Sequence, residues 1–447
     1  MASIKVYGGA GEIGGNKIHL KTEDTSLFLD FGRSFGGEKQ YYDNPYLTPR
    51  DPEQLQELGL LPDISSLYKN DEEPEIDGVM ITHPHLDHWG YCCYLDNDIP
   101  LYCGETTKDM ILNYEYSGSC APSKKYYIGN LTKSKGRKVY RDFQTFRTGD
   151  KIEFDDLSIE PIHVDHSIPG AYAYIIHTPK ETIAYTGDYR LHGPRSDLTE
   201  DFIYRAKSAE IDTLITEATN IVGADTRTEK DVRKDLTQII GETNGLVITN
   251  FNNRDIDRLR TAYKAAKING RKLVISTKQA FLLQEITKDK HLDIFDITND
   301  NILVFSKNRK RTQAWEQEIH EKTKTYNGKE LNKIQEQTVL VASYYDMNEI
   351  MKINPQPGST FISSQSEAFD EEGEIQHKRL LNWCEHMGLP QYQAHASGHI
   401  GPCQLKNTIK QIQPKKLIPV HTERPNQLKK YISNLKCKIK TPKQTKK

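Results

Sequence analysis

The chain has 447 residues, with 60 basic and 62 acidic side chains and a formal net charge of −2. Its length predicts two domains, or one domain with a large insertion. The near balance of charge neither requires nor excludes a polyanionic partner. We expect no transmembrane helix, because no run of about 18 apolar residues occurs. The start, MASIKVYGG, also lacks the long apolar stretch of a signal peptide.

The seven cysteines form no C-x-x-C pair and no regular framework. An odd, scattered set is typical of reduced thiols, so we expect a cytoplasmic protein without zinc bound by cysteine.

The first 200 or so residues favour short β-strands separated by Gly, Asp and Pro turns. Residues 33–75 are rich in Tyr, Pro and acidic side chains and predict a long loop. Nine strands are expected, at residues 4–8, 16–22, 26–32, 77–83, 99–104, 157–164, 171–178, 181–188 and 211–218.

The pattern changes after about residue 220. EKDVRKDLTQIIGET places its apolar residues on one helical face, and a strand (245–251), a helix (254–270) and another strand (271–277) follow. This β-α-β order predicts a parallel, Rossmann-like layer, and the absence of G-x-G-x-x-G argues against a dinucleotide site. Further strands are expected at 301–306, 337–343 and 359–364, a helix at 375–388, and short β segments across 393–421.

The stretch THPHLDHWG follows an apolar strand and holds His83, His85, Asp87 and His88 within six positions. Imidazole and carboxylate are the ligands of hydrolytic zinc. In H-x-H-x-D-H the loop can turn His83 and His85 to one metal and Asp87 and His88 to a second. A surface histidine-rich turn is the alternative, disfavoured by the preceding buried strand.

Further ligands are expected at the ends of other strands. His163 and His166 lie in IHVDHSIPG, Asp188 in AYTGD, His421 in LIPVHTE and Asp30 in LFLDFG. Each residue alone is more often a capping or turn residue, but their shared placement favours a metal site.

H-P-H-L-D-H, with LFLD before it and YTGD after it, resembles the metallo-β-lactamase superfamily. The resemblance implies an αββα sandwich with a dinuclear metal site. It also implies that Asp30 supports the ligands, that Asp188 bridges the metals and that His166 is the third ligand of the first metal. His163 is the alternative for that ligand.

Three later stretches, TLITEATN, QAHASGHIG and LIPVHTE, resemble the additional motifs of β-CASP nucleases, and HASGH and the N-terminal GGAGEIG resemble RNase J. The resemblance implies a metallo-β-lactamase domain at 1–219 and 394–447 interrupted by a β-CASP domain at 220–393. Without the C-terminal extra domain of bacterial RNase J, the chain is more similar to the short archaeal members.

The resemblance implies a role for each motif residue. His83, His85 and His166 bind one zinc ion; Asp87, His88 and His421 bind the other; Asp188 bridges, and Asp87 and Asp188 are catalytic as well. His395 donates a proton to the leaving oxygen and is oriented by Glu217. Ser397, Gly398 and His399 bind a 5′-monophosphate. Gly170 stands where RNase J usually has aspartate, and Glu217 where many members have aspartate, so fine specificity stays open.

We therefore expect a ribonuclease with two zinc ions, which Mn²⁺ or Mg²⁺ can replace in assay, acting on single-stranded RNA. A 5′-to-3′ exonuclease is favoured, and endonuclease action is open. The alternatives are a β-CASP nuclease acting on DNA or another phosphodiester, and a catalytically silent RNA-binding subunit. A homodimer without a nucleotide cofactor is expected. Basic stretches at 133–147, 306–315 and 429–447, and Arg254 and Arg258, are candidate RNA contacts, although charged runs are usually solvated faces.

Overall fold

The computed structural model describes the chain except for residues 1, 44–45, 69–73, 119–129, 133–137, 142, 224–226, 308–310, 367–370 and 444–447. It divides into two compact units. The first comprises Met1–Leu191, Arg195–Ala224 and Gly398–Lys447, and the second His192–Pro194 and Asp225–Ser397. The boundaries that the sequence suggested, 219/220 and 393/394, lie a few residues before those of the second unit.

The first unit contains two large sheets. One has the order β1-β2-β3-β4-β5-β8, with strands Ser3–Gly8, Lys17–Lys21, Ser26–Phe31, Gly78–Ile81, Leu101–Gly104 and Phe143–Phe146. The other has the order β22-β21-β13-β12-β11-β10-β9, with strands Lys438–Ile439, Lys416–Val420, Thr213–Glu217, Thr182–Tyr185, Tyr172–His177, Ser158–His163 and Ile152–Glu153. A separate pair joins β6 (Asn130–Thr132) to β7 (Lys138–Tyr140).

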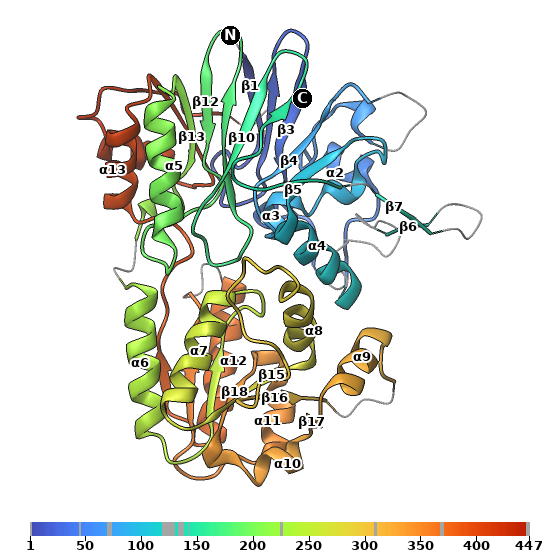
Figure 1. Cartoon of the computed structure of the whole chain (residues 1–447), viewed down its shortest axis with the longest axis vertical. Helices are drawn as coiled ribbons and strands as arrows, with labels where there is room; N and C mark the ends of the chain where they lie inside the picture. Colours follow the sequence, from blue (N-terminus) through green and yellow to red (C-terminus); the bar gives the residue numbers. More distant parts are fainter. Residues whose placement is uncertain are drawn as a thin grey trace. The chain divides into compact units, whose positions relative to one another are not determined.

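The two sheets pack face to face, with helices on both outer sides (Figure 1). Apolar residues of both sheets share one buried cluster, for example Ile18 and Leu29 with Ile176 and Ile183. The outer layers are formed by α1 (Phe35–Glu38), α2 (Pro52–Glu57), α3 (Leu86–Trp89) and α4 (Glu105–Ser117) for the first sheet and by α5 (Ser196–Ser208), α13 (Pro402–Ile412) and α14 (Pro425–Tyr431) for the second. The unit is the predicted αββα sandwich.

The second unit is a parallel sheet of order β17-β16-β15-β18-β14-β19-β20. Its strands are β14 (Val247–Asn250), β15 (Lys272–Ser276), β16 (Ile302–Phe305), β17 (Thr325–Tyr326), β18 (Thr338–Val341), β19 (Thr360–Ser363) and β20 (Gln391–Gln393). Its helices are α6 (Glu229–Glu242), α7 (Ile256–Ile268), α8 (Thr277–Ile286), α9 (Ala314–Lys322), α10 (Gly328–Asn332), α11 (Met347–Ile353) and α12 (Glu371–His386). The parallel α/β layer expected after residue 220 is confirmed.

Two predictions of secondary structure were wrong. Residues 33–75 were expected to form a long loop, but they contain α1 and α2. The sequence indicated short β segments across 393–421, but α13 occupies Pro402–Ile412. Pro402 starts the helix, and Leu405, Ile409 and Ile412 bury one apolar side against the second sheet. Packing against the second sheet stabilises this helix. The many polar residues of CQLKNTIKQI make its helical pattern hard to recognise in the sequence.

Among the described residues, no helix is long and apolar enough to cross a membrane. The six described cysteines form no disulfide bond with one another; Cys120 lies outside the described residues.

Candidate metal centre

The loop that follows β4 positions the central histidine cluster. His85 caps α3, and its carbonyl accepts a hydrogen bond from the His88 backbone N–H at 3.0 Å. Asp87 and His88 therefore lie on one short helical turn. Two glycines let this turn sit close to the N-terminal strands: a Cβ on Gly32 would lie 1.6 Å from the Asp87 carbonyl oxygen, and one on Gly14 2.6 Å from Asp87 Oδ2. The GGAGEIG loop thus forms one wall of the cluster.

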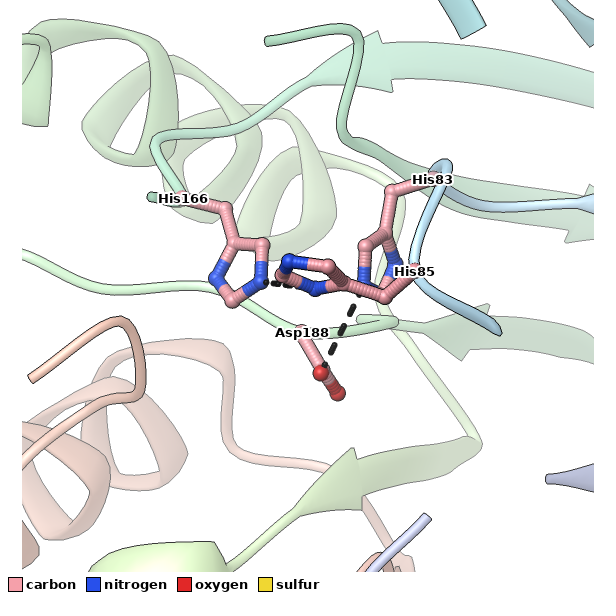
Figure 2. A group of neighbouring side chains, drawn as sticks. All are labelled: His83, His85, His166 and Asp188. Carbon is pink, nitrogen blue, oxygen red and sulfur yellow. Dashed lines mark hydrogen bonds and ion pairs between the residues drawn. The ribbon is translucent and has the colours of Figure 1, made fainter. Parts of the chain in front are cut away.

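The first group of candidate ligands comprises His83, His85, His166 and Asp188 (Figure 2). Nδ1 of His85 lies 3.0 Å from Nε2 of His83 and 3.0 Å from Nε2 of His166. Asp188 Oδ2 lies 3.6 Å from His83 Nε2. Three imidazoles and one carboxylate from three parts of the chain therefore converge on one point.

The second group comprises Asp87, His88 and His421. Asp87 Oδ2 lies 3.1 Å from His421 Nε2 and 3.8 Å from His88 Nε2. Asp188 Oδ2 also lies 3.2 Å from His88 Nε2 and 3.7 Å from His421 Nε2. The same carboxylate of Asp188 is thus within reach of both groups, as expected of a bridging residue.

The donor set suits metal ions. Nε2 of His88 and Oδ1 of Asp188 are buried, and neither has a hydrogen-bond partner among the described residues. Buried polar atoms are rarely left without partners, so these two indicate ligand positions. Imidazole with carboxylate is also the usual ligand chemistry of hydrolytic zinc. The residues fit a zinc site.

Electrostatics point the same way for three of the candidate ligands. Burial lowers the pKa of His83 and of His166 well below the usual value, which keeps both imidazoles neutral. Burial raises the pKa of Asp188, but the neighbouring His421 and His88 outweigh it and hold the pKa well below its usual range. Neutral imidazoles and an ionised carboxylate are the protonation states in which these groups bind a metal. For His88 burial lowers the pKa, but the Asp188, Asp30 and Asp87 carboxylates outweigh it and raise the pKa well above its usual value.

Hydrogen bonds fix which histidine nitrogen faces the centre. His166 Nδ1 donates to the Gly398 carbonyl at 2.6 Å, and His88 Nδ1 donates to Asp30 Oδ2 at 2.8 Å. In both rings Nε2 is left with a lone pair toward the cluster. Asp30, predicted to support the ligands, is fully buried and also accepts from the Thr82 N–H at 2.7 Å. The Tyr185 hydroxyl donates to its second oxygen at 2.7 Å.

Thr219 is a residue that the sequence reasoning missed. Its hydroxyl donates to Glu217 Oε2 at 2.6 Å and lies 2.8 Å from His421 Nδ1. Because the hydroxyl proton is given to Glu217, His421 Nδ1 is the donor in the second bond. Thr219 therefore fixes the tautomer of His421, and its position two residues after Glu217 in TEATN was the available signal.

Glu217 belongs to a third group of candidate ligands, together with Asp188, His399 and His421. It was expected to orient His395, but its carboxylate lies 3.1 Å from His399 Nδ1 and accepts from the Tyr189 N–H at 3.1 Å. His399 Nδ1 lies 3.7 Å from Asp188 Oδ2. Burial lowers the pKa of His399, but Glu217 and Asp188 outweigh it and raise the pKa to about 9. His399 thus lies beside the metal ligands in the first unit.

The remaining predicted site residues divide between the two units. His395 belongs to the second unit, where its Nδ1 lies 3.2 Å from the Ser364 carbonyl oxygen. Ser397 is in that unit as well, and its carbonyl is 2.8 Å from His192 Nε2. His163, the alternative third ligand, is absent from the three groups and stacks on Tyr172 with ring centroids 4.6 Å apart. Of the two histidines, His166 is the one that belongs to a group of candidate ligands.

Several candidate RNA contacts proved to be structural. Trp315 is 5% exposed, and Phe143 and Phe146 are in the core, so these rings offer no stacking surface. Arg258 is fully buried, and its guanidinium binds Glu229 at 3.0 Å and the Ser364 carbonyl at 2.8 Å. Residues 133–137, 142, 308–310 and 444–447 of the basic stretches lie outside the described residues.

Comparison with known proteins supports the resemblance. Residues 391–442 match the family described as Zn-dependent metallo-hydrolase RNA specificity domain. Ribonuclease J of Mycoplasma genitalium is 25% identical over 445 residues, which cover 94% of this chain and 68% of that protein. Ribonuclease J of Helicobacter pylori strain J99 is 28% identical over 304 residues, which cover 66% of this chain. The matched part is only 38% of the length of that relative.

A solved structure shows the same fold. The crystal structure of a protein of unknown function from Enterococcus faecalis V583 superposes with a TM-score of 0.77, 23% sequence identity, and coverage of 99% of this chain and 98% of that one. The chain therefore has a metallo-β-lactamase fold with a β-CASP insertion.

Proposed function

We propose, from the premise that the chain is RNase J-like, that it is a zinc-dependent ribonuclease that hydrolyses single-stranded RNA. The observation that carries the proposal is the convergence of two groups of histidine and aspartate side chains that both include or contact Asp188. The similarity to curated Ribonuclease J proteins supports RNA as the substrate. A 5′-to-3′ exonuclease with 5′-monophosphate preference is favoured, in a cytoplasmic homodimer.

We assign one zinc ion to His83, His85 and His166 and a second to Asp87, His88 and His421, with Asp188 shared. When bound, such a metal pair lowers the pKa of coordinated water and neutralises charge on a phosphate group. The chain's own contribution is to hold the ligands in fixed tautomers through Asp30, Thr219 and the Gly398 carbonyl.

We further propose that His399, rather than His395, donates the proton to the leaving oxygen. Its support is geometric, because His399 lies next to Asp188 and is held by Glu217. The Glu217 carboxylate accepts from His399 Nδ1 and so directs the other ring nitrogen away from itself. An imidazolium ring can donate a proton to a leaving oxygen. The phosphate-binding role predicted for Ser397, Gly398 and His399 is the competing assignment.

The experiment uses RNA oligomers of one sequence with 5′-monophosphate, 5′-hydroxyl or 5′-triphosphate ends, together with the matched single-stranded DNA, with and without chelator. Release of mononucleotides from monophosphorylated RNA, abolished by chelator, is the expected result. The His85→Ala variant, which lacks one ligand, is expected to be inactive. Cleavage that survives chelator, or no cleavage of any RNA, contradicts the proposal, and faster cleavage of DNA than of RNA reassigns the substrate.

A further inference from the structure

The loop that joins β1 to β2, residues 9–16, is bonded to two of the three candidate ligands of the second group. The Gly9 carbonyl accepts the backbone N–H of His421 at 2.7 Å. The backbone N–H of Asn16 donates to the Asp87 carbonyl at 3.0 Å. Both bonds join main-chain atoms, so a substitution of either side chain in the loop leaves them possible. The loop therefore holds the backbone at Asp87 and His421.

The third residue of the group, His88, is linked to the Asn16 side chain by a series of hydrogen bonds. Asn16 Nδ2 donates to the Tyr185 hydroxyl oxygen at 3.1 Å. That hydroxyl donates to Asp30 Oδ2 at 2.7 Å, and the same carboxylate oxygen accepts from His88 Nδ1 at 2.8 Å. Because the hydroxyl has one proton and gives it to Asp30, only the NH₂ side of the amide can face it. The direction of every bond in the series is therefore fixed.

The two carboxylate oxygens of Asp30 have different partners. The Thr82 N–H donates to Oδ1 at 2.7 Å, whereas the Tyr185 hydroxyl and His88 Nδ1 both contact Oδ2. The Thr82 hydroxyl, which lies 3.0 Å from His83 Nδ1, is within reach of both oxygens, at 3.0 and 2.9 Å. A change at Tyr185 therefore acts most directly on His88 and less on His83, which belongs to the first group.

The Asn16 amide is buried with only half of its hydrogen-bonding capacity in use. Asn16 is 1% exposed, and its Oδ1 has no hydrogen-bond partner among the described residues. This oxygen faces Gly9, where an added Cβ would lie 2.0 Å from it. A buried polar atom without a partner lowers the stability of the fold, and an apolar side chain of similar size would avoid that loss. Stability alone therefore does not account for an amide at this position.

We propose that Asn16 is a positioning residue for the second metal: its amide orients the Tyr185 hydroxyl toward Asp30, and Asp30 in turn holds His88 with Nε2 toward the ion. The inference rests on the zinc assignment of the proposed function and adds what sets the affinity of one of the two ions. Groups behind a metal-bound histidine fix the orientation of its ring and raise its basicity. Without the amide, the Tyr185 hydroxyl is free to rotate, and its hydrogen bond to Asp30 weakens.

The test is a zinc titration of metal-free, full-length protein against a chromophoric chelator, which resolves the affinities of the two ions. Asn16→Ala and Tyr185→Phe are each expected to weaken one affinity by about 10-fold, the lower end of the usual effect of such partners, and to leave the other within about twofold of wild type. Because both act through the same hydroxyl, the double variant should lose no more than Tyr185→Phe alone. In His88→Ala, which lacks a ligand of the affected ion, Tyr185→Phe should leave the remaining affinity unchanged.

Matched controls remove the same groups away from the metal centre, and both should keep the two zinc affinities of wild type. Tyr68→Phe removes a buried hydroxyl that donates to the Pro62 carbonyl at 2.7 Å, and Asn269→Ala removes an amide that donates to the Thr237 carbonyl at 2.9 Å. Urea unfolding of the metal-free proteins measures the loss of stability in each variant.

The inference is overturned if Asn16→Ala loses stability but keeps both zinc affinities, or if both affinities weaken equally. Binding of a single zinc ion by wild-type protein overturns it as well. RNA cleavage by the same proteins is assayed separately. Two tightly bound zinc ions without cleavage of any RNA refute the proposed function and leave the inference standing, whereas unchanged affinities in variants that cleave RNA refute the inference alone.

Discussion

Asp30 and His421 adopt left-handed backbone conformations, with φ of 59° and 52°. A non-glycine residue in this region costs on the order of 1–3 kcal/mol and persists only where its surroundings hold it. Asp30 is held by Thr82, His88 and Tyr185, and His421 by the Gly9 carbonyl, which accepts its backbone N–H at 2.7 Å. Both strained residues lie in the histidine–aspartate cluster. The strain lowers the stability of the fold, and in return the two backbones orient side chains of that cluster.

Asp30→Asn is expected to weaken zinc binding by roughly 10- to 100-fold, the usual effect of losing a carboxylate behind a metal-bound histidine. The amide no longer offers a charged acceptor to His88 Nδ1. Zinc affinity is measured by competition with a chromophoric chelator. Glu160→Gln, which changes only an exposed carboxylate beside His177, is the control. Equal zinc affinity in Asp30→Asn and wild type is incompatible with the assigned role.

His399→Ala is expected to lower kcat by about 100-fold or more on RNA with any 5′ end, the usual effect of losing a general acid. His395→Ala, in the second unit, is expected to have a smaller effect on kcat. The comparison is made with monophosphorylated and 5′-hydroxyl RNA under saturating substrate. If His399→Ala affects only monophosphorylated RNA, the phosphate-binding role is correct and the proton donor is another residue.

At the scale of elements, the pattern of apolar residues was enough to predict the buried strands of both sheets in the first unit. All nine strands expected before residue 220 are present. Their apolar residues are buried, and Ile18 and Ile176, for example, lie in the core that the two sheets share. α13 was missed because its apolar residues are few and its burial depends on the second sheet. Likewise, its place beside a strand end suggested Arg258 as an RNA contact, whereas its ion pair with Glu229, 29 residues earlier, makes it a structural residue.

Arg258→Leu is expected to lower the free energy of unfolding of the second unit by about 3–5 kcal/mol, because it leaves the Glu229 carboxylate buried without a counter-charge. Arg258 binds both Glu229 oxygens, at 3.0 and 3.1 Å. Arg260→Leu breaks only the partly exposed pair with Asp257, at 3.2 Å, and should cost less than about 1 kcal/mol. Urea unfolding measures both variants. Similar losses in the two would contradict the structural role of the buried pair.

His19 on β2 gives the fold a defined pH dependence. Burial, with the charges of Lys21 and Lys5, lowers the pKa of His19 to about 4, against about 6.5 in the unfolded chain. The folded state therefore binds fewer protons between these values, and stability falls as the pH falls from about 6.5 toward 4. In metal-free protein, His19→Gln should show a smaller loss of stability between pH 7 and pH 5 than wild type. His291→Gln, in an exposed position, is the control, and equal losses in all three proteins refute the assignment.

At the scale of the molecule, the sequence predicted both units and their order, because the change from alternating strands to helix–strand repeats is visible in the composition. The candidate ligands that converge in the structure were also singled out from the sequence, because several of them follow a buried strand: Asp188 after β12 and His421 after β21, for instance. The sequence did not predict which histidine contacts Glu217. His395 and His399 stand four residues apart in HASGH, and the division between the units falls between them.

The most direct test of the central claim is a zinc titration of metal-free protein with RNA cleavage as the readout. Protein stripped by chelator is supplied with zinc in steps, and the bound metal is measured alongside the rate on 5′-monophosphorylated RNA. Cleavage that starts from zero and saturates at two zinc ions per chain, with His85→Ala inactive throughout, is the predicted result. Full cleavage by the metal-free protein, or saturation at a single ion, would contradict a paired metal centre built around Asp188.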